Sequence, residues 1–170
     1  MNSNRKTAII VGVLYIIGTV AGILSVVLST PLLNGQDFLV KVSSNETQFV
    51  IAALFILLMG LSLAMVPVLL FPIFKRINKV LALGYVVFRG ALETVTYIAS
   101  VIVLLFILAI GREYVAAVVP VTSSLQILGS VLKDGRDFLA PITGIVFSLG
   151  ALMLYYILYK SKLIHRWISG

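Results

Sequence analysis

Four long apolar runs, separated by shorter polar stretches, dominate the pattern of hydrophobic and polar positions along the chain. Each run is long enough to cross a hydrocarbon layer about 30 Å thick as an α-helix. The pattern therefore predicts an all-α polytopic membrane protein, with four transmembrane helices in a single domain over residues 1–170. The predicted spans cover residues 7–29, 49–74, 80–110 and 138–159.

The stretches between the spans are interpreted from their helix breakers and their polarity. Pro31 is expected to end the first span, because proline cannot continue a helix without losing a hydrogen bond. Residues 32–47 are expected to form a polar loop. Residues 121–132 are apolar but too short to cross, so they predict a separate interfacial or re-entrant helix, and the charged residues 133–137 are assigned to the same external connection.

Composition and charge narrow the class of protein. Hydrophobic residues make up 61% of the chain and charged residues 11%, against roughly 45–50% and about 25% in soluble domains. Lys and Arg without acidic residues occupy the N-terminus, the connection between the second and third spans, and the C-terminus. This distribution predicts cytoplasmic termini under the positive-inside tendency. We expect a multi-pass protein in a bacterial plasma membrane, with no nucleic acid partner.

Arg89 and Glu93 are the only charged residues within the predicted spans. A charge at the bilayer centre costs about 2.5–3.5 kcal/mol even on insertion scales, so such residues usually face the bundle interior and pair. Their spacing of four residues permits direct contact on one helix. Sequence reasoning therefore predicts a buried polar layer around this pair, with members from three spans placed by depth. The predicted layer comprises Arg89, Glu93, Thr96, Tyr97, Ser100, Tyr15 and Tyr155.

Small residues and prolines suggest how the helices pack. Gly18 and Gly22 form a G-x-x-x-G motif in the first span, which typically lets a neighbouring helix approach closely. Pro67 and Pro72 lie in the last third of the second span and predict kinks there. The alternative for these prolines is that a freed backbone carbonyl contacts a ligand or an ion.

The residue types that support common catalytic chemistry are scarce. The chain has no cysteine and one histidine, His165, which lies in a basic segment next to the membrane. No nucleotide-binding motif is present, and Glu93 with neighbouring hydroxyls makes neither a metal site nor a nucleophile with its base. We therefore expect no metal, no cofactor and no enzymatic activity.

Three stretches carry a resemblance to a known family. Residues 83–93, 12–22 and 158–170 resemble a bacterial integral-membrane family catalogued as domain of unknown function 4386, and the resemblance covers essentially the whole chain. It implies no catalytic residues. Family members usually continue into further spans, so the resemblance also implies either a natural short form or a chain that lacks C-terminal spans. A missing span would favour association with another copy or with a partner membrane protein.

Three functions remain open for the Arg89–Glu93 pair. The first is a structural clamp that fixes helix packing and offers a binding point for a lipid headgroup or partner helix. The second is a small proton-coupled transporter, in which Glu93 exchanges a proton and Arg89 adjusts its pKa or receives an anionic substrate. The third is an intramembrane enzyme, which the scarcity of catalytic groups disfavours.

Overall fold

The computed structural model describes residues 3–117 and 122–161, and these residues form helices without any strand. Four stretches are long and apolar enough to cross a membrane: Asn4–Leu33, Glu46–Phe74, Lys79–Ala116 and Ser123–Ser161. The predicted all-α class with four spans is confirmed. His165 and the rest of the C-terminal segment used in the resemblance lie outside the described residues. The elements are α1 (Ser3–Leu33), α2 (Phe38–Ser44), α3 (Glu46–Phe74), α4 (Lys79–Tyr85), the π-helical η1 (Val86–Leu92), α5 (Glu93–Ala116) and α6 (Thr122–Ser161).

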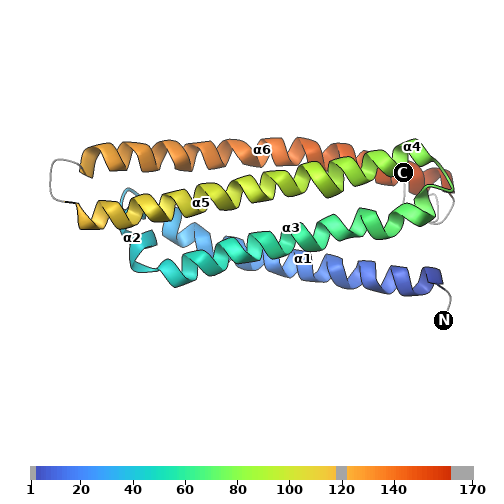
Figure 1. The fold of residues 1–170 in the computed structure, drawn as a ribbon, viewed down its shortest axis with the longest axis horizontal. Coiled ribbons are helices and arrows are strands. Elements are labelled where there is room, and N and C mark those ends of the chain that lie inside the picture. Colours follow the sequence, from blue (N-terminus) through green and yellow to red (C-terminus); the bar gives the residue numbers. More distant parts are fainter. Residues whose placement is uncertain (1–2, 118–121, 162–170) are drawn as a thin grey trace.

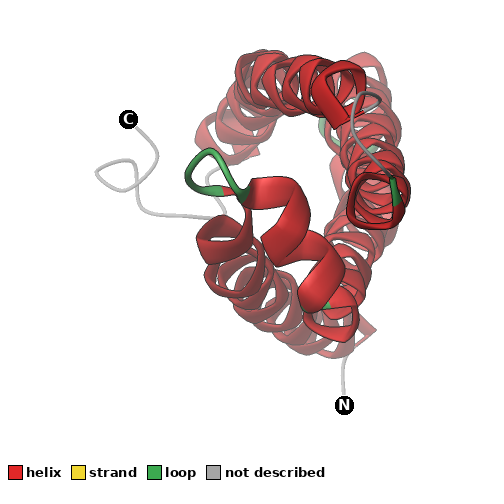
Figure 2. Ribbon diagram, turned by 90° about the vertical axis from the view of Figure 1, so that its left-hand side faces the viewer, coloured by secondary structure: helices red, strands yellow, loops and turns green. Residues whose placement is uncertain are grey.

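The long helices run side by side along the longest axis of the molecule (Figure 1). Their packing follows chain order, because α1 packs along α3, α3 packs on α5 and η1, and α5 packs on α6. Seen nearly end-on, they follow a curve rather than a flat row (Figure 2). The start of α1, the connection from α3 to α4 and the end of α6 lie at one end of the bundle (Figure 1). The other end holds α2.

The predicted polar loop at 32–47 is wrong, because α1 continues through Pro31 and α2 follows it. Leu32 and Leu33 are buried together with apolar residues of α2. Burial of that apolar surface outweighs the single hydrogen bond that a proline removes near a helix end. The α2 backbone also lies close to α5, where a Cβ added at Gly111 would come within 2.8 Å of the Leu39 carbonyl oxygen.

The separate helix predicted at 121–132 is also wrong, since α6 is a single helix that includes the charged residues 133–137. The first half of α6 has a packing partner that the sequence did not reveal, namely α2. A Cβ added at Gly129 would lie 2.9 Å from the side chain of Leu39. The ammonium group of Lys133 lies 5.4 Å from the centre of the Phe38 ring. These contacts stabilise the helix beyond the predicted start of the span.

Two apolar clusters occupy opposite ends of the bundle. The larger joins α2 to the end of α1, the first half of α3 and the second half of α5. The smaller, at the other end, contains Phe74, Ala82, Tyr85 and Ile157. The residues of the predicted polar layer belong mostly to the region between these clusters. Beside the larger cluster, an exposed ion pair between Arg112 and Glu46, with 2.6 Å between Nε and Oε1, joins the end of α5 to the start of α3.

Candidate functional site

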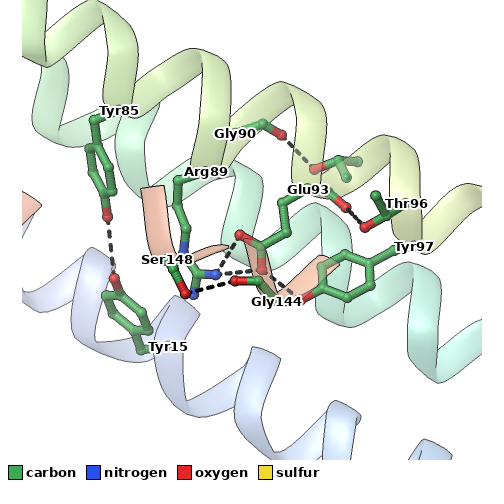
Figure 3. Close-up of polar contacts among 10 residues, drawn as sticks. Tyr15, Tyr85, Arg89, Gly90, Glu93, Thr96, Tyr97, Gly144 and Ser148 are labelled. Carbon is green, nitrogen blue, oxygen red and sulfur yellow. Dashed lines mark hydrogen bonds and ion pairs between the residues drawn. The ribbon is translucent and has the colours of Figure 1, made fainter. Parts of the chain in front are cut away.

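The centre of the polar layer is a buried network of three side chains on η1 and α5 (Figure 3). The exposed fractions of Arg89 and Glu93 are 7% and 1%. One guanidinium nitrogen of Arg89, Nη1, donates to both carboxylate oxygens of Glu93. The Tyr97 hydroxyl donates to Oε1 of the same carboxylate over 2.6 Å. The structure thus brings the two predicted charges together and adds a tyrosine, in a place shielded from the surface.

The helix that carries this network is not a regular α-helix. Residues 86–92 form a π-helical segment, after which the backbone N–H of Glu93 donates to the Phe88 carbonyl, five residues earlier. The Thr94 hydroxyl donates to the Gly90 carbonyl over 2.6 Å. Such π segments are rare and occur frequently at functional sites. Sequence reasoning missed this feature.

Both predicted kink residues lie inside α3, which continues through Pro67 and Pro72 without ending. Pro67 is buried, and a Cβ added at Gly90 of the π segment would lie 3.3 Å from its Cγ. Pro67 therefore packs beside the polar layer. Pro72 is exposed and lies away from the network.

Helix α6 contributes an aromatic ring and a glycine to the surroundings of Arg89. The guanidinium carbon lies 4.4 Å from the centre of the Phe147 ring, a geometry in which the cation is attracted to the ring face. A Cβ added at Gly150 would lie 3.1 Å from the Arg89 Cβ and 3.3 Å from its backbone nitrogen. Phe147 and Gly150 are three residues apart and therefore share a helix face. This spacing was the only sequence signal that could have identified either residue as a neighbour of Arg89.

Tyr15 of α1 meets a second tyrosine that the sequence analysis did not select. The Tyr15 and Tyr85 hydroxyl oxygens lie 3.4 Å apart, and this contact links α1 to α4 (Figure 3). Tyr85 is 1% exposed. It precedes Arg89 by four residues, a spacing that places both residues on one face of a helix.

Three other predicted members of the layer take no part in the network. The Thr96 hydroxyl donates to the Glu93 backbone carbonyl over 2.8 Å, and the Ser100 hydroxyl donates to the Thr96 carbonyl over 3.0 Å. Both hydroxyl groups therefore bond to backbone carbonyls of their own helix, α5. Tyr155 is 55% exposed, so its assignment to the layer was wrong. Equal depth does not make two residues face each other, and Tyr155 is rotated roughly 140° around α6 from Gly150.

The glycines of the G-x-x-x-G motif face α3. A Cβ added at Gly18 would lie 2.9 Å from the Leu63 side chain, and one added at Gly22 would lie 2.7 Å from the Met59 sulfur. On the same face of α1, the Ser25 hydroxyl donates to the Gly22 carbonyl over 2.7 Å. The motif residues therefore lie where α1 packs on α3.

A cavity of about 350 Å³ lies beside the network, bounded by residues from all four long helices. Tyr97 belongs to both the network and the cavity lining, because its hydroxyl binds Glu93 and its side chain borders the cavity. Sequence reasoning placed Arg136 and Asp137 in an external loop, whereas the structure places them against this cavity. Arg136 is half-buried and Asp137 is exposed, so both border the cavity at the surface of the bundle. The polar part of the lining consists of Ser25, Tyr97, Ser100, Arg136, Asp137 and Thr143.

The network contains one carboxylate, one guanidinium and one phenol. Within residues 3–117 and 122–161, no three His, Cys, Asp or Glu side chains are grouped so that they could hold a metal ion. The Glu93 carboxylate accepts hydrogen bonds from Arg89 and Tyr97. This carboxylate is held between a cation and a hydroxyl rather than next to a nucleophile.

Comparison with known proteins is informative at the level of the family. No curated protein and no solved structure matches the chain. The family model described as domain of unknown function (DUF4386) matches residues 10–170. With nearly the whole chain matched, this protein belongs to the DUF4386 family.

Proposed function

We propose that the buried Arg89–Glu93 pair is a structural clamp of a non-enzymatic integral membrane protein, and that it holds α6 against the rest of the bundle. The observation that carries this proposal is the position of Arg89, which contacts both α5 and α6. Its guanidinium binds Glu93 on one side and lies over the Phe147 ring on the other. Its backbone nitrogen and Cβ border Gly150.

The packing of α6 explains why such a clamp is needed. Among the described residues of this helix, only Gly129, Gly150 and Ile157 are buried. Ile157 joins the smaller apolar cluster, and Gly150 packs on Arg89. Apolar burial does not drive association between helices inside a bilayer, because lipid tails are as apolar as the side chains. Close contacts and polar pairing therefore carry a large share of the attachment of α6.

A double-mutant cycle tests the clamp. Arg89→Ala or Glu93→Ala alone leaves one buried charge without its partner, which typically costs about 3–5 kcal/mol. We expect each single variant to lower the melting temperature in detergent and the amount accumulated in membranes, and the double variant to recover a substantial part of both. Losses that add independently in the double variant would contradict the clamp.

The exposed pair supplies a matched control with the same residue types. Arg112 and Glu46 also form an ion pair, but their side chains are 58% and 37% exposed. Exposed pairs typically contribute about 0.2–1 kcal/mol. The corresponding cycle with Arg112→Ala and Glu46→Ala is therefore expected to give small single losses and little coupling.

A second candidate function, a proton-coupled carrier, is favoured by the double role of Tyr97. Its hydroxyl binds Glu93 and its ring lines the cavity, so polar atoms connect the cavity to the buried carboxylate. Glu93→Gln preserves the shape but removes titration. In proteoliposomes, normal folding of this variant with loss of proton-coupled flux would support transport. Equal flux in the variant and the parent protein would contradict a role for Glu93 in proton exchange.

We also propose a bacterial plasma membrane as the location, with both termini on the cytoplasmic side. The basic segments without acidic residues support this orientation. The start of α1, the basic connection before α4 and the end of α6 share one end of the bundle (Figure 1), which is compatible with a single cytoplasmic face. Association with a second copy or a partner membrane protein belongs to the same proposal.

A further inference from the structure

The cavity between the four long helices is separate from the clamp. Neither Arg89 nor Glu93 lines it, and Tyr97 is the residue that the two sites share. The cavity lies between the middle of α3, at Ile56 and Met59, and the middle of α5. Its volume of about 350 Å³ is within the range of pockets for small molecules. Ionisable groups inside a membrane-spanning bundle are a common mark of a binding site.

Four residues of the lining carry hydroxyl groups whose hydrogens are engaged within the protein. Each hydroxyl has one hydrogen to donate and two lone pairs that accept. All four hydroxyl hydrogens in the lining are already engaged, at donor–acceptor distances between 2.6 and 3.0 Å. The donors are Ser25 to the Gly22 carbonyl, Tyr97 to Glu93, Ser100 to the Thr96 carbonyl and Thr143 to the Leu139 carbonyl. A hydroxyl oxygen of this set that a ligand reaches therefore serves as an acceptor and not as a donor.

Arg136 supplies the complementary group. Its side chain is half-buried, and its guanidinium makes no ion pair within residues 3–117 and 122–161. A guanidinium offers five N–H donors and accepts nothing. Asp137, the next residue, adds a carboxylate to the same lining. The cavity thus presents one strong cationic donor, one anion and several neutral acceptors.

We propose that this cavity binds a small zwitterion, in which a phosphate or carboxylate is joined to an ammonium group that carries N–H donors. The anionic oxygens of the ligand bind Arg136, because guanidinium groups match such oxygens in charge and geometry. The ammonium N–H groups bind Asp137 and the hydroxyl oxygens. The carbon skeleton contacts the apolar lining formed by Val26, Ile56 and Met59.

This ligand chemistry has two sources, a free solute and the headgroup of an aminophospholipid. The arrangement of the helices is compatible with both, because α1 and α6 stand at the two ends of the packing series and share little direct packing. The two sources are separated by offering the same phosphoethanolamine group in two forms, first as free O-phosphoethanolamine and then as phosphatidylethanolamine in a bilayer.

The first arm titrates the purified full chain in detergent with O-phosphoethanolamine by calorimetry. Phosphocholine serves as the matched ligand, since it has the same charges but a trimethylated ammonium without N–H donors. We expect phosphocholine to bind at least tenfold more weakly. Arg136→Gln is expected to weaken O-phosphoethanolamine binding at least tenfold, and Arg112→Gln, the same change at an exposed arginine, is expected to leave it unchanged.

The second arm repeats the comparison in nanodiscs that contain phosphatidylethanolamine or phosphatidylcholine, with retained lipid measured by native mass spectrometry. Preferential retention of phosphatidylethanolamine that Arg136→Gln abolishes, without binding of the free compound, identifies the lipid headgroup as the ligand. If Arg136→Gln does not fold, Ala140→Phe replaces it, because this change fills the cavity without removing a charge. Equal behaviour of the amine and trimethylamine ligands in both arms, or of the cavity variant and the parent protein, would overturn the proposal.

Discussion

Glu93 accepts hydrogen bonds from two side chains on its own helix segment, Arg89 and Tyr97. A carboxylate in a low-dielectric interior is stable only when its charge and its lone pairs are both compensated. Arg89 supplies the charge and Tyr97 a further hydrogen bond. The tyrosine is therefore as much a part of the site as the ion pair, although it carries no charge.

Removal of the Tyr97 hydroxyl tests that contribution. Tyr97→Phe keeps the ring against the cavity but deletes the hydrogen bond to a charged group, which typically contributes about 1.5–3 kcal/mol. We expect a lower melting temperature in detergent. Tyr155→Phe, the same change at an exposed residue of α6, is expected to have almost no effect. Equal melting temperatures for the two variants would show that the Tyr97 hydrogen bond contributes nothing.

Individual residues were most predictable from the sequence where a residue type is rare in its surroundings. Two charges in an apolar run must be buried and paired, and both are. It was weaker where the contact depends on how neighbouring helices are rotated about their axes. The depth of a residue in the membrane follows from its position along the helix, whereas the rotation of the helix about its axis does not follow from the sequence. Tyr155 was therefore wrongly included in the layer, and Phe147 was missed.

At the scale of elements, the contact between η1 and α6 depends on the absence of a side chain at one position. The space at Gly150 is bounded by the Arg89 backbone, which cannot move aside as a flexible side chain could. By contrast, a Cβ added at Gly144, on the same helix, would meet nothing within 4 Å. Substitution of Gly144 therefore reports on helix propensity alone, whereas substitution of Gly150 reports on helix propensity and packing together.

The same substitution at both glycines is expected to have opposite effects on stability. Gly144→Ala is expected to stabilise α6, because alanine is favoured over glycine in helices by about 0.8–1 kcal/mol. Gly150→Ala gains the same propensity but crowds the Arg89 backbone, and overpacking typically costs about 1–3 kcal/mol. We expect its melting temperature to be below that of Gly144→Ala. The reverse order would contradict close packing of α6 on η1.

The errors at this scale share one physical cause. Residues 32–47 were assigned to a loop because they are polar, and residues 121–132 to a separate helix because they are too short to cross. In the structure α2 packs on α5, and its Leu39 also lies against Gly129 in the first half of α6. Tertiary contacts between two such segments are invisible to an argument that treats each segment alone. The spans themselves were predictable, since apolar length suffices to identify them.

At the scale of the whole molecule, the absence of native cysteine makes the proposed orientation directly testable. Single cysteines can be introduced at two exposed positions at opposite ends of the bundle, Ser44→Cys at the end of α2 and Lys79→Cys at the start of α4. With intact cells and a membrane-impermeant maleimide, we expect labelling at position 44 and protection at position 79. Labelling at position 79 alone would invert the proposed orientation.

The sparse burial of α6 has a consequence for how the molecule responds to its surroundings. A helix of 40 residues is about 60 Å long and exceeds the hydrocarbon thickness of a bilayer, about 30 Å. With three buried positions among its described residues, most of its side chains are exposed on the surface of the bundle. Because Gly150 of α6 packs on Arg89, we expect a change in lipid length or lateral pressure that shifts α6 to alter the contact with Arg89.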